Sequence, residues 1–147
     1  MKDILGVDLA PNFVEEAKKL HPGINFYQGN MLSLTFPDNS WAGITAFYCL
    51  IHIPHTQVVD ALKELKRVLL PGGVLLLTFH VGSEIAHVDR FFEQDVNMDW
   101  VFFEVPEFEA YLKQAGYERI SSIERAPYDP EIEHQSRRAY IFAYKPL

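Results

Sequence analysis

The sequence is poor in the residues that several classes of protein require. It contains one cysteine, Cys49, so no disulfide can form within the chain, and a reducing cytoplasm is the expected compartment. Its longest apolar runs, such as residues 74–79, are far shorter than the roughly 20 residues of a membrane-spanning helix. No basic-then-apolar leader opens the chain, so we expect neither an export signal nor a membrane partner.

Positive charge is also scarce. The 147 residues include 13 Lys and Arg against 20 Asp and Glu, which gives a net charge of −7. Proteins that follow nucleic-acid phosphates usually carry a basic face, so a small molecule or another protein is the expected partner. The pair His52 and His55 brackets a proline, which prevents the helix that would place both on one face, and we expect no metal site.

Strand-like and helix-like patterns alternate in the first half of the chain. Residues 44–51 are almost entirely apolar, which is typical of a strand covered on both faces in a parallel sheet. The order strand, helix, strand, turn, strand, helix, strand predicts a parallel sheet with right-handed crossovers. The expected strands are residues 4–7, 24–27, 44–51 and 74–79, and the expected helices are residues 13–20 and 56–69, with Thr56 as a cap.

The second half has a different pattern. Residues 82–103 are rich in aromatic and acidic residues without a clean period, and residues 106–115 predict an amphipathic helix. Residues 117–124 and 139–144 alternate as strands do, and two strands joined without a helix must be antiparallel. The sequence therefore predicts one α/β domain over residues 1–147, with a mostly parallel sheet and a C-terminal antiparallel hairpin.

Several stretches, in this order and spacing, resemble the class I S-adenosylmethionine-dependent methyltransferases. LKELKRVLLPGGVLLL, Leu62–Leu77, resembles the family's helix, Pro-Gly-Gly turn and fifth strand. GVDLAPNFVEEAKK resembles the second strand, the ribose-binding acid and the following helix, and AFYCLIHIP, Ala46–Pro54, resembles the fourth strand and the loop behind the cofactor. The resemblance implies a doubly wound, Rossmann-like fold and methyl transfer from S-adenosylmethionine to a small molecule.

The resemblance begins at the family's second strand. We therefore expect the family's first strand and its glycine-rich cofactor loop to lie ahead of Ile4, outside this sequence, which would impair cofactor binding. In the family's fold the first strand lies between the strands that residues 4–7 and 44–51 resemble. Because its absence would leave backbone groups unpaired, we expect these two strands to pair with each other or a homodimer to fill the gap.

The resemblance also implies the cofactor-binding residues. Asp8, with Leu9 beside it, would accept hydrogen bonds from both ribose hydroxyls; the alternative is that Asp8 only caps the helix after Pro11. Asn30 would accept a hydrogen bond from the adenine amine and Met31 would pack on the adenine ring. The alternatives are a turn residue at Asn30 and a core residue at Met31.

Phe47 and Tyr48 end the third strand, where the resemblance puts the wall beside the methionine part of the cofactor. An aromatic face near a sulfonium stabilises it by about 0.5–2 kcal/mol, although both residues could instead be plain core. His52 lies just beyond and is the candidate catalytic residue, because it could orient a substrate or accept a proton. A structural histidine is the alternative.

Residues 82–103 and 128–138 correspond to the segments where the family builds its substrate lid. Their acids and aromatics would suit an amine-bearing or aromatic substrate, but a solvated, dimer-forming surface explains them equally well. Two other functions stay open. One is a NAD-dependent oxidoreductase, since Asp8 suits that ribose as well. The other is a non-catalytic fragment or degenerate paralogue that acts as a binding or oligomerisation module.

Overall fold

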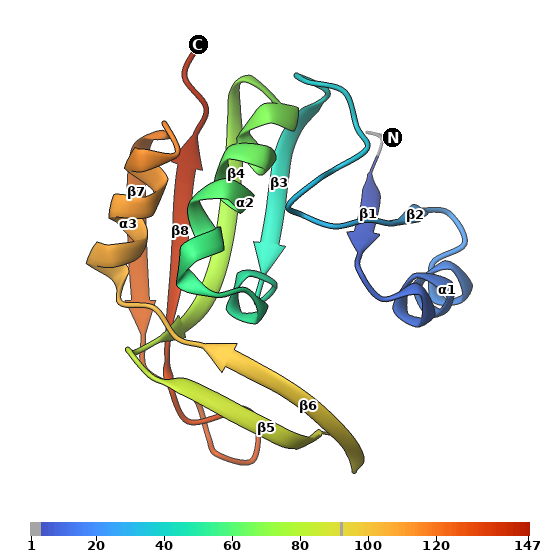
Figure 1. The fold of residues 1–147 in the computed structure, drawn as a ribbon, viewed down its shortest axis with the longest axis vertical. Coiled ribbons are helices and arrows are strands. Elements are labelled where there is room, and N and C mark those ends of the chain that lie inside the picture. The colour runs from blue at the N-terminus through green and yellow to red at the C-terminus, as the bar shows by residue number, and fades with distance from the viewer. Residues whose placement is uncertain (1–3, 92) are drawn as a thin grey trace. The chain divides into compact units, whose positions relative to one another are not determined.

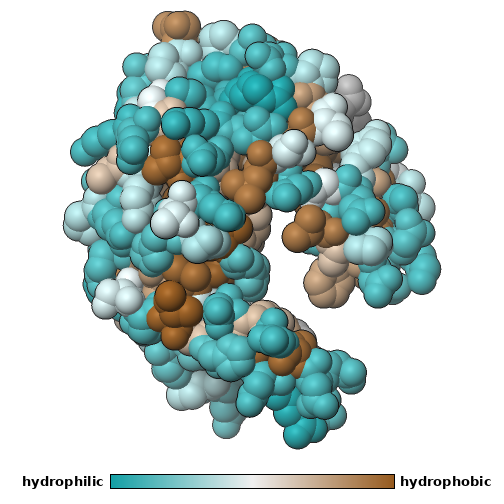
Figure 2. All heavy atoms as spheres, in the orientation of Figure 1, coloured by the Kyte–Doolittle hydropathy of each residue, from teal (hydrophilic) through white to brown (hydrophobic). Residues whose placement is uncertain are grey.

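A computed structural model describes residues 4–91 and 93–147 of the protein. The chain forms two compact units, the first up to Pro37 and the second Asp38–Leu147 (Figure 1). In the described ranges, no helix is long and apolar enough to cross a membrane. On the face drawn in Figure 2, hydrophilic residues cover most of the surface and hydrophobic residues form small patches between them.

The first unit is one strand–helix–strand motif. It consists of β1 (Leu5–Asp8), α1 (Pro11–Leu20) and β2 (Asn25–Gln28), and the two strands are parallel. These elements confirm the predicted ones to within about two residues at each end. Proline at the first position of α1 is favourable because its fixed φ suits a helix and its missing N–H would have no partner there.

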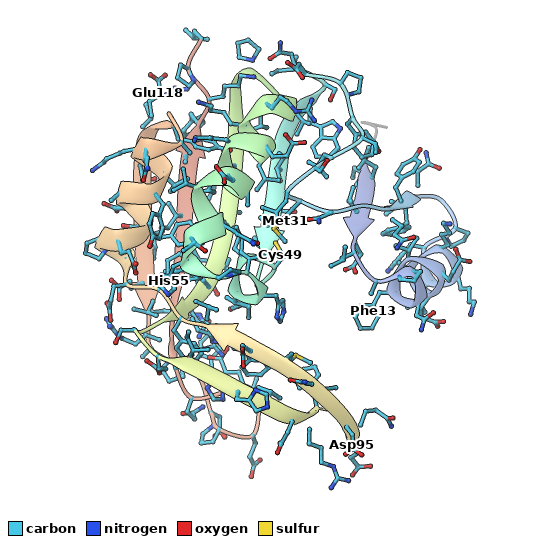
Figure 3. The ribbon with its side chains drawn as sticks, viewed as in Figure 1. Phe13, Met31, Cys49, His55, Asp95 and Glu118 are labelled. Carbon is cyan, nitrogen blue, oxygen red and sulfur yellow. The ribbon has the colours of Figure 1, made fainter. Side chains whose placement is uncertain are left out.

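The inward face of α1 is narrower than the sequence pattern indicates. The helical spacing of residues 13–20 would place Phe13, Val14 and Leu20 on one apolar face. Val14 is buried, whereas Phe13 and Leu20 are 68% and 66% exposed. The two strands of this unit are short, so they offer too little surface to bury all the apolar side chains of α1. Figure 3 marks Phe13 on α1.

The second unit contains a four-stranded mixed sheet with the order β3-β4-β8-β7. β3 and β4 are parallel, and β8 is antiparallel to both β4 and β7, which confirms the predicted antiparallel hairpin at the C-terminus. A separate hairpin pairs β5 with β6. The elements are β3 (Trp41–Phe47), the 3-10 helix η1 (Leu50–His52), α2 (His55–Val68), β4 (Leu69–Val81), β5 (Ile85–Phe91), β6 (Gln94–Val101), α3 (Val105–Gln114), β7 (Glu118–Arg125) and β8 (Arg137–Tyr144).

The core of the second unit lies between this sheet and the helices α2 and α3, which lie side by side across one of its faces (Figure 1). Alternate residues of β4, Leu75, Leu77 and Phe79, are fully buried. The ring of Phe79 stacks on that of Phe108 in α3, with centroids 4.5 Å apart. The period-2 pattern of the strand and the apolar face of the helix therefore meet in one core.

The Pro-Gly-Gly turn after α2 is built into the beginning of β4. The strand already begins at Leu69, and its register with β3 shifts between Trp41 and Gly43. Gly72 has a positive φ of 74°, and a Cβ on Gly73 would lie 2.8 Å from the carbonyl oxygen of Leu70. The segment thus needs glycine at both positions, one for backbone conformation and one for space.

Some details differ from the sequence-based expectations. Thr56 does not cap α2, because the helix begins one residue earlier, at His55, and Pro54 occupies the cap position. Within the first unit the strand partner of β1 is β2, and within the second unit that of β3 is β4. Strands β5 and β6 lie in the segment for which we expected no regular structure.

Candidate functional site

The carboxyl ends of β1 and β2 lie next to each other in the first unit, because the strands are parallel and Asp8 pairs with Gln28. The N–H of Gly29 donates to the carbonyl oxygen of Asp8 at 2.9 Å, and Nε2 of Gln28 donates to the carbonyl oxygen of Leu9 at 3.2 Å. A Cβ on Gly29 would lie 2.7 Å from Cγ1 of Val7, so the loop packs directly on β1. Asp8 and Leu9 are therefore fixed beside the loop that follows β2.

The Asp8 side chain is exposed at this edge. Its Oδ1 accepts a hydrogen bond from the N–H of Ala10, 2.8 Å away, which forms a turn just before α1 begins at Pro11. Within the described residues the carboxylate makes no other hydrogen bond, so Oδ2 is open to a ligand. The side chain thus supports the helix start and can still accept a hydrogen bond from a sugar hydroxyl.

Asn30 and Met31 follow β2 at the same edge. Oδ1 of Asn30 accepts a hydrogen bond from the N–H of Leu32 at 2.9 Å, and the carbonyl oxygen of Asn30 accepts one from Ser33 at 2.9 Å. The side chain therefore builds a turn, and its amide hydrogens and the second lone pair of Oδ1 are open to a ligand. Met31 is half-buried beside it (Figure 3).

In the second unit β3 ends at Phe47, which is 53% exposed, and the chain bends sharply at Tyr48. Tyr48 has a positive φ of 54°, a conformation that costs a non-glycine residue on the order of 1–3 kcal/mol. Its N–H donates to the carbonyl oxygen of Thr78 in β4 at 3.1 Å, and its ring lies 5.1 Å from that of His80. Burial raises the pKa of the Tyr48 hydroxyl, although the nearby Arg138 cation opposes this.

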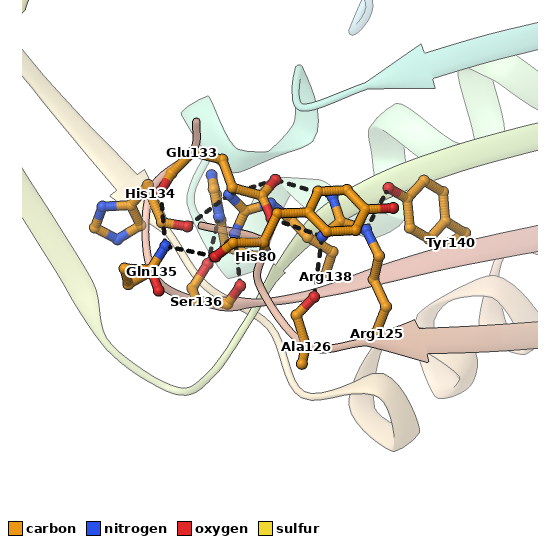
Figure 4. A network of polar contacts seen from close by, with 10 residues as sticks. His80, Arg125, Ala126, Glu133, His134, Gln135, Ser136, Arg138 and Tyr140 are labelled. Carbon is orange, nitrogen blue, oxygen red and sulfur yellow. Dashed lines mark hydrogen bonds and ion pairs between the residues drawn. The ribbon is translucent and has the colours of Figure 1, made fainter. Parts of the chain in front are cut away.

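A polar network surrounds His80, near the end of β4, and extends to the loop before β8 (Figure 4). Nδ1 of His80 lies 2.8 Å from Oγ of Ser136, and Arg138 donates to the same hydroxyl oxygen. Nη1 and Nη2 of Arg138 also donate to the carbonyl oxygens of Ser136 and His134, both at 2.8 Å. Burial, and after it the positive charge of Arg138, lower the pKa of His80 to about 4. This buried histidine is therefore neutral.

Glu133 connects this network to β7 (Figure 4). Arg125 donates to both of its oxygens, at 2.6 and 2.9 Å, and the guanidinium of Arg138 lies 3.5 Å from Oε2. The Arg125 hydrogen bonds, with one from the N–H of Tyr128, lower the pKa of Glu133 to about 2. The paired charges hold the loop before β8 in place above the end of β4.

A depression of about 410 Å³ lies beside His52, between η1 and the β5–β6 hairpin. Its volume falls in the range of about 300–1,000 Å³ that is usual for small-molecule sites. Among the described residues, no group of three or more His, Cys, Asp or Glu could hold a metal ion. The residues that line the depression, called the His55 pocket below, are His52, Ile53, Pro54, His55, Ile85, Asn97, Met98, Asp99 and Val101.

The structure places the sequence-predicted residues in two groups, one in each unit. In the first unit Asp8, Leu9, Asn30 and Met31 share one strand edge. In the second unit Phe47 and Tyr48 lie at the end of β3, and His52 lies at the His55 pocket. Sequence reasoning missed His80 and the pocket role of His55, because their partners are more than 50 positions away along the chain. It also missed Arg138, whose partners Ser136 and His134 lie in a loop without a periodic pattern.

The chain matches known methyltransferases in sequence and in fold. A family model described as "Methyltransferase domain" matches residues 1–73. A ubiquinone/menaquinone biosynthesis C-methyltransferase of Bartonella tribocorum is 28% identical over 123 residues, which are 82% of this chain and 45% of that protein. The chain spans less than half the length of the curated relatives it matches.

Solved structures show the same fold. A SAM-dependent methyltransferase of Methanosarcina mazei superimposes with a TM-score of 0.81 at 20% identity, over 97% of this chain and 82% of that one. The [4+2]-cyclase SpnF superimposes with a TM-score of 0.76 at 20% identity, over 99% of this chain and 66% of that one. At this identity the likeness is one of fold, and the fold also carries reactions other than methyl transfer.

Proposed function

The chain belongs to the class I S-adenosylmethionine-dependent methyltransferases, and we propose that the protein transfers a methyl group from S-adenosylmethionine to a small molecule. The observation that supports this most is the Asp8 carboxylate at the carboxyl end of β1. It lies within the residues that the family model matches, it is exposed, and one of its oxygens is open. In parallel α/β sheets, ligands bind at the carboxyl ends of the strands.

The residues at this edge fit the nucleoside part of the cofactor. Oδ2 of Asp8 would accept hydrogen bonds from the ribose hydroxyls, and Leu9 would cover the sugar. The second lone pair of Asn30 Oδ1, whose first is bonded to the N–H of Leu32, would accept a hydrogen bond from the adenine amine, and Met31 would pack on the ring.

In the second unit we assign Phe47 and Tyr48 to the methionine part of the cofactor. The cofactor, when bound, supplies an electrophilic methyl carbon on a positively charged sulfur. The exposed ring of Phe47 and the ring of Tyr48, held by its strained backbone and by Thr78, offer aromatic faces to that charge. The chain itself then contributes alignment of the acceptor and exclusion of water, and His52 orients the acceptor.

A thermal-shift titration tests this proposal. We expect S-adenosylmethionine and its demethylated product, S-adenosylhomocysteine, to raise the melting temperature, because a ligand that binds only the folded state stabilises it. NAD serves as the control, since its ribose could also bind Asp8. A shift with NAD alone would favour an oxidoreductase, and no shift with any of the three would reject both enzymatic assignments.

A binding or oligomerisation module is the second candidate function. It is favoured by the sheet edges: among the described residues, β1 and β3 each have a strand partner on one side only. An unpaired edge readily accepts a strand from another chain, and here a second copy of this protein would supply it. Light scattering coupled to size exclusion measures the mass, and a monomer over the micromolar range would contradict this candidate.

The compartment we propose is the cytoplasm, on the basis of the single cysteine.

A further inference from the structure

The imidazole of His55 is held in one orientation by two side chains of α3. Its Nδ1 lies 3.0 Å from Oε1 of Glu107 and 3.3 Å from the hydroxyl of Tyr111. The Tyr111 hydroxyl donates to the same Glu107 oxygen at 2.6 Å, and the His55 ring packs on Phe103 with centroids 4.8 Å apart. Figure 3 marks His55 at the start of α2.

These contacts fix which nitrogen of His55 carries the proton. An ionised carboxylate only accepts hydrogen bonds, so Nδ1 of His55 donates to Glu107. Burial, and then the hydrogen bond to Glu107, raise the pKa of Tyr111 to about 12, which keeps Tyr111 a neutral donor. The remaining nitrogen, Nε2, has an unshared electron pair and makes no hydrogen bond within the described residues.

His55 lines a pocket whose charge favours one class of ligand. The walls include Ile53, Ile85 and Met98, and among the described lining residues the only formally charged side chain is the carboxylate of Asp99. Oδ1 of Asp99 contacts His87 at 2.9 Å, which leaves its second oxygen open. In the part of the chain that the structure describes, no lysine or arginine lines the pocket, so a cation is favoured there over an anion.

We propose that the His55 pocket binds an amine with an apolar body and that His55 takes up its proton. The proposal rests on the proposed methyl transfer. The amine binds as an ammonium ion beside Asp99 and passes one proton to Nε2 of His55, which becomes an imidazolium paired with Glu107. The freed nitrogen lone pair then attacks the methyl carbon of the sulfonium donor. A carbon–nitrogen bond forms, the carbon–sulfur bond breaks with its electron pair left on sulfur, and the product is a methylated ammonium ion.

His55 suits this role better than His52, which lines the same pocket. Among the described residues no side chain forms a hydrogen bond with the His52 ring, whereas Glu107 and Tyr111 orient the ring of His55 and would stabilise its positive charge. Glu107 and Tyr111 act through His55 and are positioning residues.

The first experiment measures binding without a methyl donor. Phenethylamine and 3-phenylpropionate differ only in carrying an ammonium or a carboxylate, and their affinities are compared by isothermal titration calorimetry. We expect the amine to bind at least about threefold more tightly, and Asp99→Asn to remove that preference, because an exposed ion pair contributes modestly. Equal affinities, or a preference that survives in Asp99→Asn, would overturn the assignment of the pocket.

The second experiment reads the His55 ring directly. Long-range ¹H–¹⁵N NMR should show neutral His55 with its proton on Nδ1, and Glu107→Gln should reduce that tautomer. With S-adenosylmethionine added, His55→Gln should lower kcat for methylation of phenethylamine about 100-fold or more. The affinity for the amine should change less than threefold, and His21→Gln, an exposed histidine of the first unit, should behave as the unchanged protein.

The outcomes separate this proposal from the function on which it rests. A protein that binds S-adenosylmethionine but shows no preference for the amine keeps its methyltransferase assignment and loses this pocket. A preference for the amine without any binding of S-adenosylmethionine overturns the methyl transfer instead, and with it the role of His55 in that reaction. A kcat of His55→Gln within tenfold of the unchanged protein would also overturn that role. Circular dichroism melting curves show that each variant is folded.

Discussion

Nδ1 of His80 lies 2.8 Å from Oγ of Ser136, and this contact joins the end of β4 to the loop before β8. Arg138 can only donate, so the Ser136 oxygen accepts from Arg138 and shares a further hydrogen bond with Nδ1 of His80. The His80 ring is thus held between the Ser136 hydroxyl and a neighbouring guanidinium. The lowered pKa of His80 follows from the same surroundings: burial first, then the positive charge of Arg138.

The neutral, buried His80 predicts that stability falls on mild acidification. Its pKa is about 4 in the folded state and about 6.5 in the unfolded state, so between these values the unfolded chain binds the extra proton. The free energy of unfolding should drop by on the order of 1–2 kcal/mol as the pH falls from about 6.5 towards 4. Urea unfolding at several pH values measures the slope. His80→Asn should flatten it, and an equally steep slope in that variant would assign the effect to other groups.

Arg138 should contribute far more to stability than its neighbour Arg137. Arg138 is 3% exposed and donates to two carbonyl oxygens and the Ser136 hydroxyl, which the single ammonium of a lysine cannot reproduce. Arg138→Lys should cost about 2 kcal/mol or more. Arg137 pairs with Glu124 at the surface, and Arg137→Lys should cost less than about 0.5 kcal/mol.

Tryptophan fluorescence during urea unfolding measures both arginine variants, because the two tryptophans, Trp41 and Trp100, lie in the second unit. Equally small losses at the two positions would contradict the buried network. They would indicate that the charge alone, which both lysine variants keep, carries the interaction.

Tyr117 follows α3 and links that helix to α2. Its buried hydroxyl donates to the carbonyl oxygen of Leu62 in α2 at 3.1 Å, and burial raises its pKa. Tyr117→Phe should lower the free energy of unfolding by about 1 kcal/mol, since it removes one buried hydrogen bond. Tyr128→Phe is the control, because that side chain is 62% exposed and its hydroxyl makes no hydrogen bond among the described residues. If both variants are equally stable, the Tyr117 contact contributes nothing measurable.

The turn before the main part of β4 has no room for a side chain at Gly73. A Cβ there would lie 2.8 Å from the carbonyl oxygen of Leu70 and 3.2 Å from that of Ala42, and backbone atoms cannot move aside cheaply. Gly73→Ala should cost about 1–3 kcal/mol in a thermal melt followed by circular dichroism. Gly23→Ala is the matched control, with no atom within 4 Å of its Cβ, and should change stability by less than about 0.5 kcal/mol. A neutral Gly73→Ala would mean that the turn relaxes.

The sequence predicted those helices and strands whose apolar and polar residues follow a regular period within one short segment of the chain. The helices α2 and α3 appear in the structure within one residue of where we expected them, because helix periodicity is a local signal. The strand expected at residues 44–51 is only partly correct: β3 begins at Trp41 and ends at Phe47, and the end of the apolar run forms part of η1. The β5–β6 hairpin was missed. Val96, Met98 and Trp100 alternate along β6, but the polar residues between them are exposed and the pattern resembles a loop.

The candidate site was predictable only in part. Asp8 could be proposed from the sequence because a carboxylate after a short apolar strand is a local feature, and the structure leaves one of its oxygens open. The turn formed by Asn30 depends on a side-chain hydrogen bond that its residue type allows but does not require. The contacts of His55 with Glu107 and of His80 with Ser136 join residues 52 and 56 positions apart, and no spacing rule predicts them.

The most direct test of the central claim is isothermal titration calorimetry of S-adenosylhomocysteine with the protein and two aspartate variants. Asp8→Ala removes a charged acceptor worth roughly 1.5–3 kcal/mol, so its affinity should fall at least about tenfold. Asp129→Ala removes a carboxylate with the same kind of local turn, in which Oδ1 accepts the N–H of Glu131 at 2.9 Å, and should bind as the unchanged protein does. An Asp8→Ala affinity within about twofold of the unchanged protein, or an equal loss in Asp129→Ala, would contradict the assignment of Asp8 as the ribose-binding residue.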